Sequence, residues 1–320
     1  MSDTLLRMRL FVAVYEERSF TAAATRENAT QSGVTQHVRK LEERHGVRLL
    51  VRDARGVTPT PAGDAYYRSC VEVLRAHERS RQTVRRFDDG LGGEVVVGLT
   101  PTITRGALAP ALARFVSLHP NVVVRVLDAY SDIVLEKLRM GEVDFGIVPG
   151  IRPAMGIRSQ LFARTPEFLV SGLRSGLALR HHRPVRLAGL GPLKVVVPSR
   201  AQARRESLEA YFAASGVAIE RRLEIDTSLG TLDFVARSDW VSINPGISML
   251  REAADTGLVV CPIVDPPLML ELYLIERERD PLTPEAMAFL EVLRGEAAAL
   301  QQRADRLVAA TDDAPPHQGG

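Results

Sequence analysis

The segment 30–46, with the sequence TQSGVTQHVRKLEERHG, has two different faces when it is placed on a helix. Val34, Val38 and Leu41 recur at helical spacing and predict a buried side. Another side is small, polar and rich in hydrogen-bonding groups, and it is formed by Ser32, Thr35, Gln36 and Arg39. The segment opens on a threonine suited to an N-cap and closes on a glycine suited to a stop, so one short helix is expected. A helix that is buried on one side and polar on the other suits the major groove of DNA.

Two further helices are predicted before this segment. The first has apolar residues at helical spacing, namely Leu6, Leu10, Phe11 and Val14. Ser19 is a suitable N-cap for a second, alanine-rich helix over Phe20–Arg26, and a tight turn follows at Asn28 and Ala29. This order is typical of a helix-turn-helix unit, although the pattern alone fits any small three-helix bundle equally well.

A short β-hairpin, or wing, is predicted after the glycine stop. Val47–Arg52 is β-prone, a turn follows, and Val57–Thr60 forms the second strand. Arg52 and Arg55 at its tip can contact phosphates or a minor groove, and a solvent-exposed turn carries such arginines just as readily. The helix beside the hairpin favours the DNA-binding interpretation.

Length and charge indicate several domains with a basic N-terminal end. A chain of 320 residues is expected to form two or three domains. Residues 1–92 contain 16 Lys+Arg and 12 Asp+Glu, a balance of +4, which leaves −2 for the rest because the total is +2. A basic end before a slightly acidic body is the usual arrangement for a nucleic-acid partner.

Cysteine usage and hydropathy point to a reducing compartment. Cys70 and Cys261 are far apart, and their spacing suggests neither a disulfide framework nor a metal site. The N-terminus lacks the pattern of a signal peptide, and no run of 18 or more apolar residues occurs. A cytoplasmic protein with no membrane partner is therefore expected.

A long helix is predicted from Pro61 to about Phe87. Steps of four and three residues, typical of a coiled-coil seam, connect Tyr66, Cys70, Val73, His77, Ser80, Val84 and Phe87. His77 and Ser80 weaken this seam, so a short contact between two helices is favoured over a long zipper. The alternative is a helix that lies on its own domain. The glycine-rich segment 88–93 then predicts a domain boundary.

The remainder alternates β and α segments. The first unit is expected to hold strands at Glu94–Leu99, Asn121–Leu127 and Phe145–Val148, with helices at Gly106–Leu118 and Ile133–Met140. A second unit is expected to begin near Glu167, with strands at Phe168–Ser171, Lys194–Val197, Leu223–Ile225 and Trp240–Ile243, and helices at Arg204–Ala214 and Thr231–Ala236. Such alternation predicts a parallel sheet covered by helices. A strand at Leu270–Ile275 and a helix at Pro284–Leu307 follow, and the polar tail 311–320 is expected to be disordered.

Several motifs in residues 5–90 belong together. They are FVAVYEERSFTAAA at 11–24, TQS at 30–32, VRKLE at 38–42, GV at 46–47 with Leu49 and Arg52, and TPTPAG at 58–63. With these motifs, residues 5–90 resemble the winged helix-turn-helix of the LysR-type transcriptional regulators. The family often has Ser-Gln-Pro-Ala at the start of the recognition helix and an Arg-Gln pair within it. Here those positions hold TQSG and Gln36-His37, so the resemblance implies the fold and not the preferred DNA sequence.

The resemblance implies an α/β chain with four parts. These are a winged helix-turn-helix DNA-binding domain at 1–60, a linker and dimerisation helix at 61–92, an effector-binding domain at 93–310 and a disordered tail at 311–320. The effector-binding domain would have the two-lobed architecture of periplasmic solute-binding proteins. Its first lobe would cover about 93–166 and 268–310, and its second lobe about 167–267.

It also implies partners and their sites. The DNA-binding set would be Thr30, Gln31, Ser32, Thr35, Gln36, Arg39, Arg52 and Arg55. Dimerisation would use Tyr66, Cys70, Val73, His77 and Val84. In the family the assembly is usually a dimer of dimers on an interrupted palindrome, and RNA polymerase is a further candidate partner.

Polar residues follow several predicted strands, where open α/β sheets bind ligands. The candidate loops are 100–104, the turn at Ser131 and 198–200, although Thr and Ser at helix starts are mostly caps. By resemblance Thr100, Thr102 and Ser131 fall where family members contact the effector. Weaker candidates in the second lobe are Ser199, Ser228 and Asn244. Hydroxyls and helix N-termini with few fixed charges favour a small organic anion, such as an aromatic carboxylate or a sulfonate.

No catalytic set is suggested by the spacing of nucleophiles, bases and acids, and Gly98-Leu99-Thr100-Pro101 is not a dinucleotide fingerprint. No cofactor or metal is expected beyond a small-molecule co-inducer. The predicted function is therefore a ligand-responsive DNA-binding regulator and not an enzyme. The alternative is a cytoplasmic small-molecule binding protein without a specific DNA target, which the N-terminal module disfavours.

Overall fold

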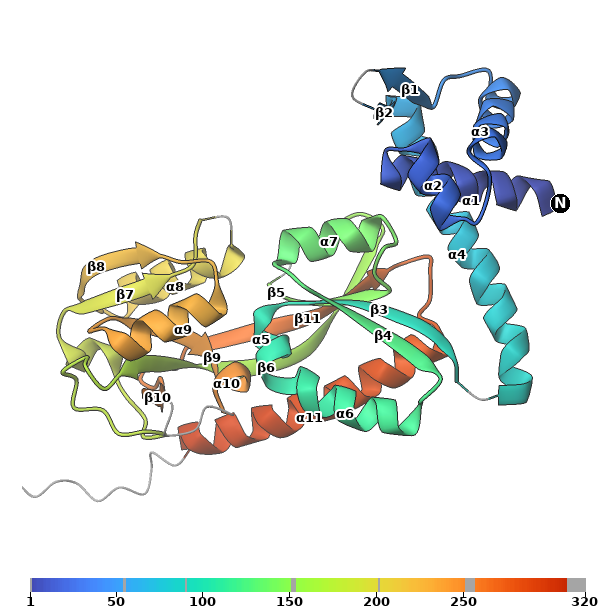
Figure 1. Ribbon diagram of the computed structural model, residues 1–320. Coiled ribbons are helices and arrows are strands. Elements are labelled where there is room, and N and C mark those ends of the chain that lie inside the picture. The colour runs from blue at the N-terminus through green and yellow to red at the C-terminus, as the bar shows by residue number, and fades with distance from the viewer. Residues whose placement is uncertain are drawn as a thin grey trace, which may run out of the picture. The chain divides into compact units, whose positions relative to one another are not determined.

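The computed structural model describes residues 2–53, 56–89, 91–150, 154–200, 202–250 and 257–309. The chain divides into two compact units, residues 1–90 and 91–320 (Figure 1). Across these described ranges, no helix has both the length and the apolar character that crossing a membrane requires.

The first unit packs three helices, a hairpin and the start of a long helix around one core. The helices are α1 (Ser2–Glu17), α2 (Phe20–Arg26) and α3 (Gln31–His45), and they are followed by β1 (Leu50–Asp53), β2 (Gly56–Pro59) and α4 (Pro61–Asp89). Phe11, Val14, Ala23 and Val34 are all fully buried where the three helices meet. The predicted cap of α2 is confirmed, because the Ser19 hydroxyl accepts a hydrogen bond from the Ala22 N–H at 3.3 Å.

The hairpin is tied to the helices on both sides. The Glu42 carboxylate at the end of α3 accepts hydrogen bonds from the N–H groups of Leu49 at 2.8 Å and Leu50 at 3.1 Å. Thr60 caps α4 by accepting from the Gly63 N–H at 3.0 Å. A Cβ on Gly63 would lie only 2.1 Å from the carbonyl oxygen of Leu49, so this close approach requires glycine. These contacts fix the hairpin as a wing beside α3.

The first turns of α4 belong to the core of this unit. Tyr66 packs edge-on against Phe11 with a centroid separation of 5.3 Å, and Cys70 is completely buried. The expectation that Cys70 faces a partner helix is therefore wrong, because its side chain is enclosed in the core of this unit. Tyr66 is partly buried, and its role in dimerisation stays a prediction. Val73 and His77 are exposed, while the side chain of Val84 lies outside the described residues.

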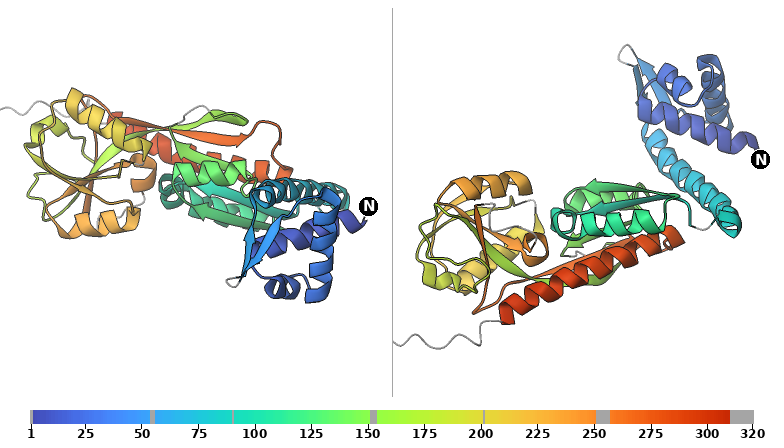
Figure 2. Two further views of the ribbon diagram at one scale, coloured as in Figure 1. Left: turned by 90° about the horizontal axis from the view of Figure 1, so that it is seen from above. Right: turned by 60° about the horizontal axis from the view of Figure 1, so that its bottom comes forward.

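The second unit is built on a long mixed sheet (Figures 1 and 2). Its strands run in the order β4-β3-β5-β11-β6-β9-β7-β8, and β10 also pairs with β6. Their bounds are β3 (Gly93–Leu99), β4 (Val122–Asp128), β5 (Phe145–Pro149), β6 (Ile157–Gly172), β7 (Leu193–Val197), β8 (Ile219–Glu224), β9 (Val241–Pro245), β10 (Leu258–Pro262) and β11 (Met269–Arg277).

One strand joins the two halves of this sheet. β6 pairs with β11 over Ile157–Pro166 and with β9 and β10 over Glu167–Gly172. We call the half with β3, β4, β5 and β11 the first lobe, and the half with β7 to β10 the second lobe. β3 to β5 are parallel, as are β7 to β9, whereas β11 runs antiparallel to both β5 and β6. The predicted parallel arrangement is therefore wrong for β6, β10 and β11, which run antiparallel to their neighbours. Of these strands, β6 and β11 carry the chain between the lobes.

Helices cover both lobes. They are α5 (Pro101–Ile103), the π-helical turn η1 (Thr104–Leu108), α6 (Ala109–Leu118), α7 (Ser131–Arg139), the 3₁₀ turn η2 (Leu187–Leu190), α8 (Ala203–Ala214), α9 (Ser228–Arg237), α10 (Gly246–Met249) and α11 (Pro284–Ala309). The first helical stretch starts at Pro101 and not at the expected Gly106, because Pro101 opens a helical turn directly after β3. α11 packs against β6, α6 and α10, so it spans the junction of the lobes (Figure 2).

Candidate functional site

α3 forms with the predicted ends and the predicted buried side. The Thr30 hydroxyl accepts a hydrogen bond from the Gly33 N–H at 3.1 Å, and Gly46 ends the helix in the left-handed conformation with φ 66°. Val34, Val38 and Leu41 are buried in the core. The helix is therefore held at both ends and along one side.

The opposite side of α3 faces solvent and carries hydrogen-bonding groups. Ser32, Gln36 and Arg39 are exposed, and Thr35 is partly buried. The Arg39 side chain is 78% exposed and donates to the Glu43 carboxylate at 2.8 Å. Gln and Arg are the side chains that most readily pair with base edges in a major groove. Of the predicted arginines in the wing, Arg55 and the side chain of Arg52 lie outside the described residues.

A cavity of about 1,060 Å³ lies between the two lobes of the second unit. This volume is at the upper end of the range for sites that take small organic molecules. Of the six residues predicted to bind an effector, the cavity brings together Thr100, Thr102, Ser131, Ser228 and Asn244. Ser199 is not among the residues that line the cavity. Apolar side chains supply much of the remaining lining.

The first lobe contributes the ends of β3 and β4. The Thr100 side chain is 2% exposed and donates to the Ile147 carbonyl at 3.3 Å. The expectation that Ser131 caps α7 is wrong, because Tyr130 occupies the N-cap and makes no side-chain cap bond. Ser131 is instead the first helical residue, and the leading N–H groups of α7 have no side-chain cap.

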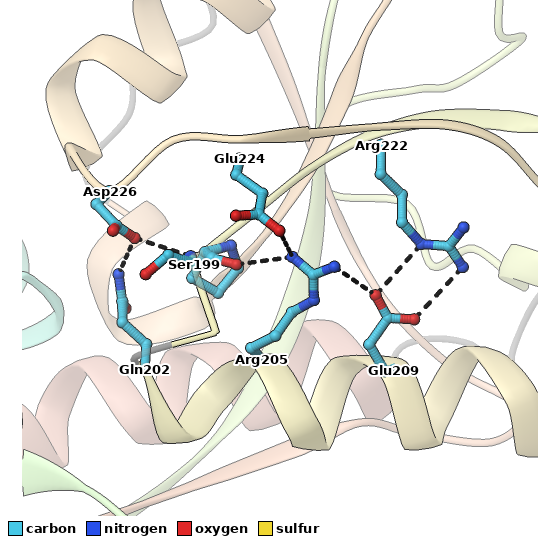
Figure 3. Close-up of polar contacts among 8 residues, drawn as sticks. Ser199, Gln202, Arg205, Glu209, Arg222, Glu224 and Asp226 are labelled. Carbon is cyan, nitrogen blue, oxygen red and sulfur yellow. Dashed lines mark hydrogen bonds and ion pairs between the residues drawn. The ribbon is translucent and has the colours of Figure 1, made fainter.

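The second lobe contributes the loop after β7 and the end of β8 (Figure 3). The Ser199 N–H donates to Asp226 Oδ1 at 2.9 Å, and the Gln202 side-chain amide donates to the same oxygen. Burial opposes ionisation of Asp226, but the hydrogen bonds from Ser199 and Gln202 outweigh it and hold the pKa below its ordinary value. Gln202 occupies the N-cap of α8, and the helix starts at Ala203, one residue before the predicted Arg204.

A network of charged residues fixes this wall. The Arg205 guanidinium donates to the Pro198 carbonyl at 2.9 Å and to the Glu224 carboxylate at 3.1 Å, and it pairs with Glu209 at 2.9 Å. Glu209 in turn accepts from Arg222 on β8 at 3.2 Å (Figure 3). The network ties α8 to β8 and to the loop after β7, so Asp226 is held in place relative to Gln202.

Arg204 and Glu167 form a bidentate ion pair at the junction of the lobes. Arg204 lines the cavity and donates from Nε to Glu167 Oε1 at 2.8 Å and from Nη2 to Glu167 Oε2 at 2.7 Å. Nη2 also donates to the Ile243 carbonyl at 2.7 Å. The Glu167 side chain is only 2% exposed, so the pair is shielded from water.

Sequence reasoning did not identify Arg204, Glu167, Gln202 or Asp226. Two signals were available. Glu167 is a lone acid directly before an apolar strand run, which indicates a buried cationic partner. Asp226 follows the end of β8 just as the predicted polar residues follow the other strands. The rule that ligands of open α/β sheets bind at the carboxyl ends of strands therefore applies to Asp226 as well.

Comparison with known proteins identifies the family. The family model of the bacterial regulatory helix-turn-helix protein, lysR family, matches residues 5–64, and that of the LysR substrate binding domain matches residues 88–298. This chain belongs to the LysR family of transcriptional regulators. Members of this family are regulators and not enzymes. Within the described ranges, no three His, Cys, Asp or Glu side chains gather in a way that could hold a metal ion.

Relatives match this LysR-type chain over nearly its whole length. It is 28% identical to the uncharacterized HTH-type transcriptional regulator YfeR of Shigella flexneri, covering 94% of this chain and 96% of the relative. It is 27% identical to the nitrogen assimilation regulatory protein nac of Escherichia coli, covering 90% and 93%.

Solved structures support the fold. A full-length OxyR variant from Pseudomonas aeruginosa has a TM-score of 0.70 at 20% identity and covers 97% of this chain and 98% of its own. Full-length CbnR complexed with its target DNA has a TM-score of 0.65 at 23% identity and covers 91% and 99%. The LysR-type chain therefore has the fold of full-length members of its family.

Proposed function

We propose that this regulator binds double-stranded DNA through the exposed side of α3 and through its wing, under the control of a small organic acid in the cavity. The observation that carries the DNA-binding part is the side of α3 that holds Gln36 and Arg39 in solvent while the other side is buried. A plain small-molecule binding protein, the alternative function, would have no use for this helix and wing.

The mode of DNA binding follows from the helix geometry. Two copies of the chain would place two α3 helices in successive major grooves, about one helical turn or roughly 34 Å apart on an interrupted palindrome. CbnR, a structural neighbour of this chain, is described as complexed with its target DNA. We assign self-association as a dimer or a dimer of dimers to α4, where Val73 and His77 are exposed. Action on DNA places the protein in the cytoplasm, where RNA polymerase is a further partner.

Polar groups of the cavity suit an acid. Neither α7 nor α8 has a side-chain cap, so the first N–H groups of both helices are able to bind an anion. The Arg204 guanidinium and the Thr102 hydroxyl add donors in the same lining. A ligand held by both lobes would change the angle between them, and this would bias the pairing of dimers and the bending of DNA.

Two measurements test the proposal. Footprinting of the full-length protein on the DNA directly upstream of its own gene should give a sequence-specific protected region, and its absence would revive the plain binding-protein alternative. Calorimetric titration with a panel of aromatic and aliphatic carboxylates and sulfonates should give binding by at least one acid. Binding restricted to amines or neutral sugars would remove the organic-acid part while leaving the DNA-binding part in place.

A further inference from the structure

We propose that the ligand of this cavity is an elongated zwitterion, whose acid group binds at Arg204 and whose cationic group binds at Asp226. This inference rests on the proposed function, which places an organic acid between the lobes, and it adds a second charged group to that acid. An amino acid with a long basic side chain or a short peptide has this chemistry.

The acid end is assigned from the hydrogen bonds of Arg204. Its Nε and Nη2 atoms are committed to Glu167 and to the Ile243 carbonyl. Its Nη1 atom makes no hydrogen bond with any part of the chain that the structure describes, although the residue lines the cavity. Because the bonds to Glu167 and to the Ile243 carbonyl fix the guanidinium, an acceptor that reaches Nη1 meets a pre-oriented donor.

The cationic end is assigned from the charge and exposure of Asp226. Its Oδ1 accepts hydrogen bonds from the Ser199 N–H and from the Gln202 side-chain amide (Figure 3), and the Ser199 side chain also hydrogen-bonds to this carboxylate. These donors are neutral, so they leave the negative charge in place, and the lowered pKa of Asp226 keeps the carboxylate ionised at neutral pH. Asp226 lines the cavity and is exposed, so an ammonium group can reach the carboxylate from solvent.

The sheet sets the separation of the two ends. The Arg204 guanidinium is anchored to Ile243 on β9, whereas Asp226 follows β8, and β7 lies between these strands. Two strand spacings correspond to about 10 Å. The wall between the ends is apolar, with Val197, Ile225 and Ile243 in the cavity lining. The cavity therefore offers a hydrogen-bond donor, an apolar stretch and a carboxylate, in that order. An extended zwitterion has an acid group, an apolar chain and a cationic group in the matching order.

Four straight-chain probes of eight carbons test this inference by calorimetry on the full-length protein. They are 8-aminooctanoate, octanoate, octylamine and suberate, which have the same backbone and differ in the groups at their ends. We expect 8-aminooctanoate to bind roughly fivefold more tightly than octanoate, because an ion pair at an exposed carboxylate contributes up to about 1 kcal/mol. Octylamine and suberate are expected to bind more weakly than 8-aminooctanoate, since each lacks one of the two matches.

Two matched variants locate the cationic end. Asp226→Asn should reduce the preference for 8-aminooctanoate over octanoate to less than about twofold while leaving octanoate binding unchanged. Asp132→Asn removes another cavity carboxylate, on the first lobe, and should keep the preference. The inference would be overturned if octanoate or suberate bound as tightly as 8-aminooctanoate. It would also be overturned if only Asp132→Asn lost the preference, or if none of the four probes bound.

The same preparations are tested for sequence-specific DNA binding without any probe. If the protein binds DNA specifically but does not prefer 8-aminooctanoate to octanoate, this inference is rejected and the proposed regulator function is retained. Octanoate binding without a preference for 8-aminooctanoate retains the organic acid and rejects only the second charge. Failure of specific DNA binding contradicts the proposed function itself and is therefore distinguishable from both.

Discussion

On the exposed side of α3, the Arg39 guanidinium donates a hydrogen bond of 2.8 Å to the Glu43 carboxylate one turn further along the helix. Their side chains are 78% and 58% exposed, so the pair stabilises the helix only slightly, by about 0.3–0.5 kcal/mol. Arg39 can therefore leave Glu43 at little cost. In the proposed complex, Glu43 competes with DNA for the guanidinium.

Glu43→Gln should strengthen DNA binding. The change removes a negative charge beside the phosphates and weakens the hold on Arg39, so we expect a roughly twofold to fivefold lower Kd at low salt. Fluorescence anisotropy with a labelled DNA site measures it. Arg174→Ala, a charge change on an exposed residue of the second unit, is the control that should have no effect. Weaker binding by Glu43→Gln would show that Glu43 makes a direct contact of its own.

Glu42→Ala should loosen the wing. It removes the acceptor of the Leu49 and Leu50 N–H groups, and leaving partly buried donors unsatisfied costs about 1–3 kcal/mol. Hydrogen exchange of the wing should accelerate in the full-length protein. The neighbouring Glu43→Ala removes an exposed carboxylate of the same type and should leave the exchange unchanged. Equal exchange in the two variants would contradict the role assigned to Glu42.

Local patterns in the sequence predict most of the first unit. Ser19 and Thr30 begin helices and Gly46 ends one, each because of a few neighbouring residues, and the structure confirms all three caps. Cys70 was predicted incorrectly because the alternating steps of four and three residues along α4 suit either a partner helix or the helix's own domain. The spacing of apolar residues alone does not distinguish a helix that packs on a partner subunit from one that packs on its own domain.

Strand pairing between distant segments is harder to predict. The start of β6, residues 157–161, is mostly exposed and lacks the apolar run that identified Phe168–Ser171. Only its pairing with β11, more than a hundred residues later, makes it a strand. Contacts in the cavity are hard to predict for the same reason, because Arg204 and Glu167 are 37 positions apart in the sequence. Polar residues at strand ends were predictable, whereas their partners were not.

Thr100→Val should abolish the response to the effector without abolishing DNA binding. The change keeps the shape of the side chain and removes the hydroxyl, while the Ile147 carbonyl still accepts from the Thr100 N–H at 3.3 Å. Reporter expression over a range of effector concentrations measures the response, and Thr100→Ser should retain it. An unchanged dose response in Thr100→Val would place the effector elsewhere.

Both thiols should be unreactive in the folded protein. Cys70 and Cys261 are 0% and 1% exposed, and burial raises the pKa of each thiol from 9.0 to about 11. The neutral form is therefore favoured on folding, and this contribution to stability is present below pH 9 and lost as the pH rises toward 11. A thiol-specific disulfide reagent at pH 8 should label neither residue until urea is added. Rapid labelling of one thiol in the native protein would contradict the burial.

The central claim is that the exposed side of α3 reads the major groove, and protection of guanine N7 from methylation tests it most directly. The wild-type protein should protect guanines in two successive major grooves of the site found by footprinting. Arg39→Ala and Gln36→Ala should each lose some of this protection and weaken specific binding by about 1–3 kcal/mol, while the protein stays folded. A protection pattern identical in wild type and both variants would show that another surface reads the DNA.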